Sequence, residues 1–408
     1  PNYRDKISYE VSHFTKGRTR LYLAYDSKFL IPNVRTTVSA TYIDDPLYNF
    51  WGFNGAASPL YKSLESNKSF ASQILDGTIP AADAALFSTM GINPLKNVSY
   101  YYTNRDIIRV LADFQGNIVP RLRWAGGVSY WNFRMGDINE SKYGYDAQST
   151  LYNHYKQFGV IKDSEANGGS RLEIKAGLVY DSRDFETAPN SGIWSEIYVN
   201  GSPDVFGDGF NYLKLSAHFR HYVRIPLGLK VGDPVFAYHL AYQGTVAGEA
   251  PFYVQQNVTA LILKQMMSEG LGSSNTLRGT RANRLIGDGY AWGNFELRVK
   301  MVNFKFLGQD FYLAANPFLD CGMIVQPYRV SEMSVLPEIN ALAIAAGYKA
   351  GEADKYIRDM AGQFICSGGA GLKLAWNQNF IVSIEVAHNF NKGIGDPFWM
   401  SIGTNYCF

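Results

Sequence analysis

Residues 398–408 read Phe-Trp-Met-Ser-Ile-Gly-Thr-Asn-Tyr-Cys-Phe, and the side-chain character changes at every second position. One face carries Phe398, Met400, Ile402, Thr404, Tyr406 and Phe408, and the other carries Trp399, Ser401, Gly403, Asn405 and Cys407. A period of two residues indicates a β-strand with two different faces. The end of the chain is therefore predicted to be a strand.

The same period recurs upstream, near residues 175 and 295 and over 380–390. In each segment the charged residues all fall in one phase, for example Glu296 and Arg298, whereas Phe295 and Leu297 occupy the other. A Lys or Arg that faces lipid at the bilayer midplane costs about 2–4 kcal/mol, and aromatic girdles flank the apolar band of a membrane barrel. With Tyr, Phe and Trp near the strand ends, the pattern favours an all-β, antiparallel transmembrane β-barrel.

Composition limits the alternatives. The 408 residues are 46% hydrophobic and 18% charged, which argues against a disordered chain. The formal net charge of +2 gives no reason to expect a nucleic-acid partner. The sequence has no apolar run long enough for a transmembrane helix. No composition shift marks a second domain, so residues 1–408 are predicted to form one barrel domain.

The period predicts about fourteen strands, near 4–15, 17–29, 33–44, 100–117, 119–134, 170–182, 192–202, 209–225, 230–246, 288–306, 309–327, 363–377, 379–391 and 397–408. Tight turns are predicted at Asn117-Ile118, Leu307-Gly308 and Asn377-Gln378. Long connections are predicted over 45–99, 135–169, 247–287 and 328–362. Outer-membrane barrels join strands by short periplasmic turns and long extracellular loops, which places both chain ends on the periplasmic side. Residues 342–346 are expected to form a short helix or a disordered loop.

Several motifs occur in a fixed order. Gly177-Leu-Val-Tyr-Asp181-Ser-Arg183-Asp184 is followed by Pro189 and Gly192. Ser274-Asn-Thr-Leu277-Arg278-Gly279-Thr280-Arg281 is followed by Asn294-Phe-Glu296 and by Pro317-Phe-Leu-Asp320-Cys-Gly322. The chain ends in Gly403-x-x-Tyr406-x-Phe408, which is similar to the assembly signal of outer-membrane barrels; a last strand with interfacial aromatics is the alternative. From about residue 170 onward this order and spacing resembles the BamA/TamA superfamily, the bacterial surface-antigen barrels that insert or translocate proteins.

The resemblance implies that the 247–287 loop folds into the barrel lumen and that its Arg278 pairs with Glu296 and Asp320. The alternation independently places both acids in the polar phase of their strands. That face is expected to point into the lumen, because lipid would not tolerate a carboxylate. Arg suits this role because its planar fork stays charged and can bind two carboxylates. Leu277, Arg278, Gly279 and Thr280 are interpreted as a conformational latch, although Thr280 replaces the aromatic usual in the family. An ordinary extracellular loop with an exposed Arg278 is the alternative.

Asp181, Arg183 and Asp184, with Pro189 and Gly192, resemble another family landmark at the periplasmic end of a strand. A charge cluster that stabilises the local turn is favoured over a binding site. The three cysteines are interpreted as small apolar strand residues, since they are too few and too scattered for a disulfide framework or a zinc site.

Family barrels have sixteen strands, with the Arg-Gly loop after the eleventh. Here nine strands are predicted before the loop and five after it, so the first two strands are expected to precede Pro1. The resemblance also implies a weak seam between the first and last strands. The family's periplasmic POTRA modules are not recognisable in this chain and are expected either to lie upstream or to be lacking.

The predicted function is insertion, assembly or translocation of proteins at the bacterial outer membrane through this lateral seam. Expected partners are membrane lipid, nascent outer-membrane or translocated proteins, and accessory periplasmic or surface subunits. No catalytic motif is found, so no enzyme activity, cofactor or metal is predicted. The alternatives are a passive pore for small solutes and a structural or anchoring barrel.

Overall fold

The structure is a computed structural model of the 408-residue chain. It describes residues 4–54, 99–328 and 362–408, except 16, 145–146, 149, 158, 187, 262–265, 378–379, 392–393, 395–397 and 405–406, plus isolated residues between 337 and 350. Of the predicted helix at 342–346, residues 344 and 345 are described and helical, and residues 342, 343 and 346 lie outside the described residues.

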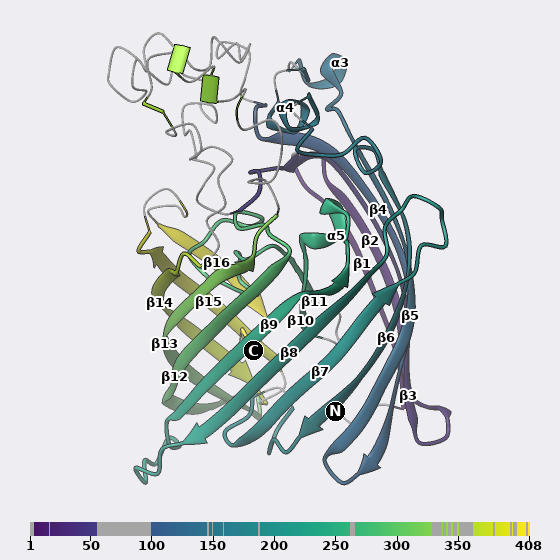
Figure 1. The fold of residues 1–408 in the computed structure, drawn as a ribbon. Coiled ribbons are helices and arrows are strands. Elements are labelled where there is room, and N and C mark those ends of the chain that lie inside the picture. The colour runs from purple at the N-terminus through teal and green to yellow at the C-terminus, as the bar shows by residue number, and fades with distance from the viewer. Residues whose placement is uncertain are drawn as a thin grey trace.

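Fourteen antiparallel strands form one continuous sheet in the order β1-β2-β3-β4-β5-β6-β7-β8-β9-β12-β13-β14-β15-β16 (Figure 1). Their bounds are β1 Asp5–His13, β2 Thr19–Ile31, β3 Val34–Asn49, β4 Tyr102–Val119, β5 Leu122–Gly136, β6 Gly168–Asp181, β7 Gly192–Ser202, β8 Tyr212–Arg224, β9 Val235–Gly248, β12 Gly289–Phe306, β13 Gln309–Gln326, β14 Ile365–Trp376, β15 Phe380–Asn389 and β16 Trp399–Thr404. The predicted fold class and strand count are confirmed, with nine strands before the Arg278 loop and five after it. Strands β1 and β16 are the two ends of this order.

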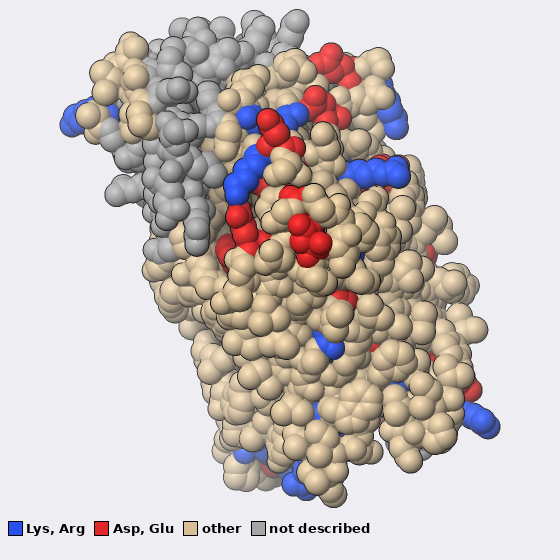
Figure 2. Space-filling view, turned by 45° about the vertical axis from the view of Figure 1, so that its right-hand side comes forward, with Lys and Arg blue, Asp and Glu red and all other residues tan. Residues whose placement is uncertain are grey.

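Polarity is inverted relative to a water-soluble sheet. On β15 the outward side chains Phe380 and Ile384 are 51% and 47% exposed, whereas Ser383 and Glu385 on the inner face are buried. In the view of Figure 2 the middle of the wall is largely uncharged, and charged side chains gather toward the two ends. An apolar exterior around a polar interior is the arrangement of a transmembrane β-barrel, because lipid tolerates apolar side chains and excludes charge.

The connections at the short-turn end differ from the prediction at one point. Leu307 and Gly308 form the tight turn between β12 and β13, as expected, and both have a positive φ. The turn between β4 and β5 is at Pro120-Arg121, three residues beyond the predicted Asn117-Ile118. The strand pairing continues past Asn117, through a register shift, to Val119 and Leu122. Asn377 makes a turn with a positive φ, but Gln378 lies outside the described residues.

The long connections hold the remaining elements. Helices α3 (Glu140–Tyr143) and α4 (Leu151–Gln157) lie between β5 and β6. The connection from β9 to β12 contains helix α5 (Phe252–Gln255) and the small hairpin β10–β11 (Asn257–Leu261 and Met266–Glu269), which the sequence did not predict. None of the described helices is long and apolar enough to span a bilayer.

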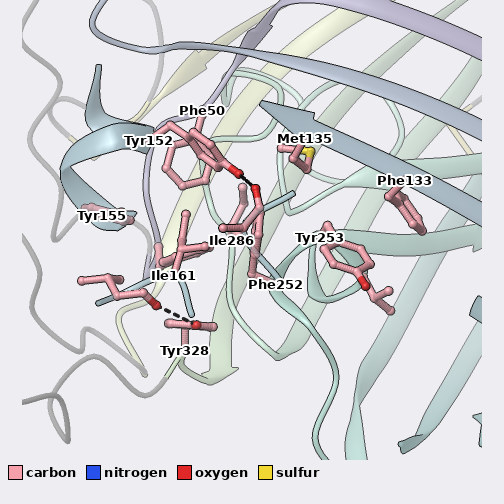
Figure 3. Close-up of a cluster of buried hydrophobic side chains, with 14 of the residues drawn as sticks. Phe50, Phe133, Met135, Tyr152, Tyr155, Ile161, Phe252, Tyr253, Ile286 and Tyr328 are labelled. Carbon is pink, nitrogen blue, oxygen red and sulfur yellow. Dashed lines mark hydrogen bonds between the residues drawn. The ribbon is translucent and has the colours of Figure 1, made fainter. Parts of the chain in front are cut away.

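An aromatic cluster joins these long connections at the end of the barrel opposite the short turns (Figure 3). Phe50 and Phe53 follow β3, Tyr152 and Tyr155 belong to α4, and Phe252 belongs to α5. Phe53 stacks on Tyr328 with ring centroids 4.2 Å apart, and Phe50 meets Tyr152 edge to face at 5.6 Å. Because these rings are buried against one another, they pack the loops into one body across the end of the barrel.

A disulfide corrects the interpretation of the cysteines. Cys321 on β13 and Cys366 on β14 lie directly opposite each other and are bonded, and among the described cysteines Cys407 is the free one. The bond could not be predicted from the sequence, because the two cysteines are 45 residues apart and spacing alone does not reveal which strands become neighbours.

Candidate functional site: the Arg278 cluster in the lumen

The Arg278 segment is held in a compact turn before it reaches the wall. The hydroxyl of Thr276 donates to the carbonyl of Gly272 and accepts from its N–H, both at 2.8 Å. The N–H of Thr280 donates to the carbonyl of Leu277, and the N–H of Ser273 donates to the carbonyl of Thr280. These bonds close residues 272–280 on themselves, so the turn presents Arg278 in a fixed position.

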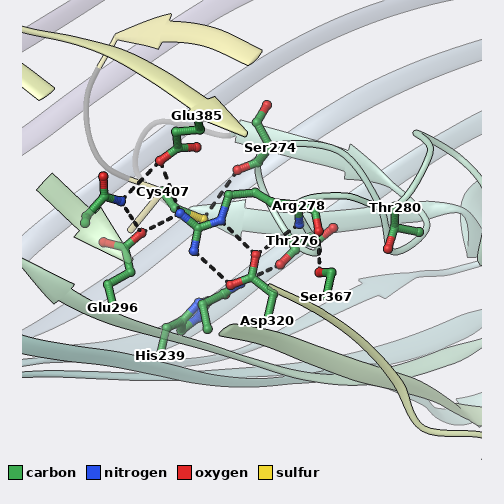
Figure 4. A network of polar contacts seen from close by, with 12 residues as sticks. His239, Ser274, Thr276, Arg278, Thr280, Glu296, Asp320, Ser367, Glu385 and Cys407 are labelled. Carbon is green, nitrogen blue, oxygen red and sulfur yellow. Dashed lines mark hydrogen bonds and ion pairs between the residues drawn. The ribbon is translucent and has the colours of Figure 1, made fainter. Parts of the chain in front are cut away.

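Arg278 contacts acids from three strands (Figure 4). Its Nε and Nη2 donate to the two carboxylate oxygens of Asp320 on β13, each at 2.8 Å, and its backbone N–H donates to the same group at 3.0 Å. Its Nη1 donates to Glu296 of β12 at 2.6 Å and to Glu385 of β15 at 3.2 Å. The guanidinium also lies 3.5 Å from the ring centre of Phe318. Arg278, Glu296 and Asp320 have no exposed side-chain surface.

Two further cations balance the acids. Arg298 donates from Nε to Glu296 at 3.0 Å, and Lys373 of β14 donates to Glu385 at 2.7 Å. The Arg278 cluster is therefore Arg278, Glu296, Arg298, Asp320, Lys373 and Glu385, with three cationic and three anionic side chains. Such a balance is required in an enclosed site, because an unpaired buried charge is far more costly than a paired one.

The residues around Arg278 seat the turn on the inner faces of β12–β15. Leu277 is buried in an apolar cluster with Trp292 and Ile324. Gly279 has φ of 81°, and a Cβ there would lie 3.1 Å from that of Ala387, so both the backbone and the close approach favour glycine. Thr280 accepts a hydrogen bond from Asn389, and the hydroxyl of Ser367 donates to the carbonyl of Arg278.

The structure thus brings Arg278 together with both predicted partners, Glu296 and Asp320, inside the lumen. It adds Glu385, which sequence reasoning placed only in the polar phase of its strand. The alternation indicated that Glu385 faces the lumen, but the sequence does not predict how the loop is rotated against the barrel wall. That rotation decides which of several inward acids the guanidinium reaches.

Comparison with known proteins shows the family of the chain. A family model described as the Omp85 superfamily domain matches residues 96–404. The chain belongs to the Omp85 superfamily. This membership places it among proteins of the bacterial outer membrane. A comparison with curated proteins gave no match.

Two solved Omp85 structures are similar. BamA from Haemophilus ducreyi, in a form lacking POTRA domains 1–3, has 12% identity and a TM-score of 0.54, over 98% of this chain and 64% of that one. CdiB from Escherichia coli has 11% identity and a TM-score of 0.48, over 99% of this chain and 63% of that one. The chain therefore spans less than two thirds of each. At this identity the BamA likeness supports the fold alone.

The motif of Asp181, Arg183 and Asp184 forms a local charge-stabilised turn after β6. Arg183 binds both carboxylate oxygens of Asp181, at 2.9 and 2.8 Å, and lies 3.9 Å from the ring centre of Trp194. Asp184 accepts from the backbone N–H groups of Asn190 and Ser191. Every one of these contacts is internal to the turn and its flanking strands.

Gly192 and the 188–189 segment complete that turn. Gly192 has φ of 106°, and a Cβ there would lie 2.5 Å from the carbonyl oxygen of Ser182, which explains the glycine. Pro189 lines a small cavity with Arg298 and Tyr312, and its neighbour Ala188 packs with Tyr312 and Ala375. The turn after β6 therefore reaches across the barrel to β13 and β14.

The C-terminal motif is only partly described. Gly403 pairs with Ser383 on β15, and Tyr406 lies outside the described residues. The position of Phe408 differs from the sequence prediction, which placed its side chain on the same face as Phe398, Met400 and Ile402. Those three residues are 66%, 58% and 68% exposed on the outer surface, whereas Phe408 packs against the buried ring of Tyr222 on the inner face of β8.

Proposed function

We propose that this chain acts in the insertion, assembly or translocation of proteins at the bacterial outer membrane, through a lateral seam along the free edge of β16. The observation that carries this proposal is the position of the β9–β12 connection. It lies in the lumen, and Arg278 anchors it to acids of β12, β13 and β15. The cluster positions protein elements and contains no arrangement that would perform covalent chemistry.

An occupied lumen argues against a passive pore. The Arg278 turn covers the inner faces of β12–β15, and Lys214 of β8 donates to the carbonyl of Val254 in α5 at 3.0 Å. The aromatic cluster packs the long loops together at the extracellular end. A solute channel requires an open aqueous path, and in this arrangement protein fills much of that path.

The edge of β16 supports a lateral route. β16 is described over Trp399–Thr404 and pairs with β15 from Ala387↔Trp399 to Val382↔Thr404. Its other edge has no pairing partner among the described residues. Unsatisfied backbone groups in hydrocarbon cost several kcal/mol each, so an incoming strand would gain by adding to that edge. In this proposal both chain ends face the periplasm, from which unfolded client proteins and accessory subunits approach.

The test is reconstitution of the full-length protein in phospholipid vesicles with an unfolded outer-membrane barrel as client. We expect vesicles with the protein to accelerate client folding, measured as protease-protected, heat-modifiable client. Arg278→Gln is expected to lower that rate, and Arg281→Gln, on the same loop but half-exposed, is the matched control. Equal client folding in empty and loaded vesicles would refute the proposal.

Single-channel recording distinguishes the proposed function from the main alternative, a passive pore for small solutes. An insertion or translocation barrel with a filled lumen is expected to show little steady conductance in planar bilayers. A stable, large, solute-sized conductance in the wild-type chain would favour the passive pore. An anchoring barrel would show neither client folding nor conductance.

A further inference from the structure

The last described residues lie inside the barrel. Phe408 does not continue the outer face of β16, because its ring lies 5.5 Å from that of His239 and 6.4 Å from that of Tyr222, centre to centre. Both rings are buried on the inner faces of β9 and β8. In the view of Figure 1 the C mark falls within the outline of the barrel. We call residues 407–408 the lumenal tail.

Arg298 links this tail to the Arg278 cluster. Its Nη2 donates to the backbone carbonyl of Phe408 at 2.9 Å, and its guanidinium lies 5.2 Å from the Phe408 ring centre. Its Nε donates to Oε2 of Glu296, whose Oε1 accepts from Arg278. Glu296 thus bridges two arginines, one on the loop and one that holds the tail.

A second contact joins the same two parts. The thiol of Cys407 donates to the carbonyl of Ser274, 3.3 Å away, and Ser274 precedes Arg278 by four residues in the compact turn (Figure 4). The tail therefore contacts the loop directly through Cys407 and indirectly through Arg298 and Glu296.

From these contacts we propose that Arg298 is a positioning residue, which tethers the end of the last strand to the Arg278 loop inside the lumen. Release of this tether frees Cys407 and Phe408 from the Arg278 loop and from the inner wall. The tether rests on the contacts above; the claim that it must open during activity rests on the proposed function.

Cross-linking tests the tether without any activity assay. Ser274→Cys supplies a second thiol beside native Cys407, whereas Cys321 and Cys366 are already paired. In full-length protein in vesicles, mild oxidation with diamide is expected to join residues 274 and 407. Adding Arg298→Gln is expected to lower the ratio of linked to unlinked protein about ten-fold, the loss expected when a charge-assisted hydrogen bond is removed.

Matched variants separate tethering from folding. Arg298→Lys is expected to restore part of the cross-link, because a single ammonium can bind the tail or Glu296 but lacks the planar fork that holds both. Lys300→Gln, on the same strand but without contact to Phe408, should leave the yield unchanged. Phe408→Ala removes the ring while keeping Arg298 and Glu296, and should lower the yield even if Arg298→Gln does not fold. Equal yields in folded parent, Arg298→Gln and Phe408→Ala proteins would overturn the tether.

Locking the tether tests its role. We expect oxidised Ser274→Cys protein to lose client folding and to regain it when a reductant cleaves the bond. If the locked protein folds client as fast as the reduced one, the requirement for opening is wrong while the proposed function stands. If neither form nor the wild type folds client, the proposed function fails, and the cross-linking yields still decide whether the tether exists.

Discussion

Arg278 illustrates how one side chain can organise a large barrel. Its guanidinium contacts two carboxylate oxygens of Asp320 and one each of Glu296 and Glu385, and its backbone also binds Asp320. An intact buried ion pair adds little net stability, but removing one partner leaves charge unpaired. The cluster therefore acts through geometry: the loop is stable in the lumen only where these acids meet.

Replacing Arg278 by Gln is expected to destabilise the folded loop by about 3–5 kcal/mol, since three carboxylates would then face only two cations. Arg278→Lys keeps the charge but not the fork, so an intermediate loss is expected. Proteolytic cleavage within 270–288 of the vesicle-embedded protein measures the effect. Arg281→Gln is the control, and equal cleavage of the Arg278 and Arg281 variants would contradict the prediction.

At the scale of elements, Glu165 joins three segments at the long-loop end of the barrel. Its carboxylate accepts from the N–H of Lys162 at 3.2 Å, from the N–H of Phe252 at 2.7 Å and from the hydroxyl of Tyr328 at 3.0 Å. Burial raises the pKa of Glu165 above its ordinary value, although these hydrogen bonds and Lys162 oppose the shift. Burial also raises the pKa of Tyr152 and Tyr328, which face Glu165, so both phenols stay neutral at the pH values where Glu165 titrates.

A raised carboxyl pKa means that the folded loops bind the proton more tightly than the unfolded chain does. The contribution of Glu165 to loop stability is therefore greatest at low pH, and it falls as the pH rises from the ordinary value near 4.5 through the raised one. We expect loop proteolysis to increase over this window in the wild type and to be flatter in Glu165→Gln. The same pH dependence in both proteins would exclude Glu165 as its source.

The disulfide joins β13 and β14 next to two residues of the site, because Asp320 and Ser367 adjoin the two cysteines in sequence and pair with each other. Replacing both cysteines by Ser is expected to lower the unfolding free energy by about 2–4 kcal/mol. Denaturant unfolding in detergent micelles measures the change, with Cys407→Ser as the control. Thiol labelling of unfolded, unreduced wild-type chain should modify Cys407 alone; labelling of all three cysteines would exclude the disulfide.

The whole molecule depends on an outward apolar wall and an inward polar one. Ile384 and Ser383 are neighbours in the middle of β15, one exposed on the outer surface and the other buried inside. Ile384→Lys is expected to cost up to about 2–4 kcal/mol of stability in a bilayer, the range for a cation that faces lipid at the midplane. Folding yield of urea-unfolded chain into vesicles measures it. Ile384→Thr, polar but uncharged, is the control, and a yield equal to that of Ile384→Lys would contradict the prediction.

The sequence alone determined the properties that arise within a strand. Alternation assigned Glu296 and Asp320 to the lumen and Ile384 to the outer surface, since lipid accepts only one of the two faces. It also located all fourteen strands to within five residues at each end. The loop that enters the barrel was predicted only through the family resemblance that the Arg-Gly motif carries.

Only the tertiary structure decided how separate segments meet. The third acid Glu385, the pairing of Cys321 with Cys366 and the inward path of Phe408 depend on register, on the rotation of the loop and on which walls face each other across the lumen. A period of two residues assigns a side chain to a face but carries no information on what stands opposite it. Phe408 shows a second limit of the sequence pattern. The pattern alone placed its ring toward lipid, whereas the folded chain provides Arg298 and His239 as contacts inside the barrel.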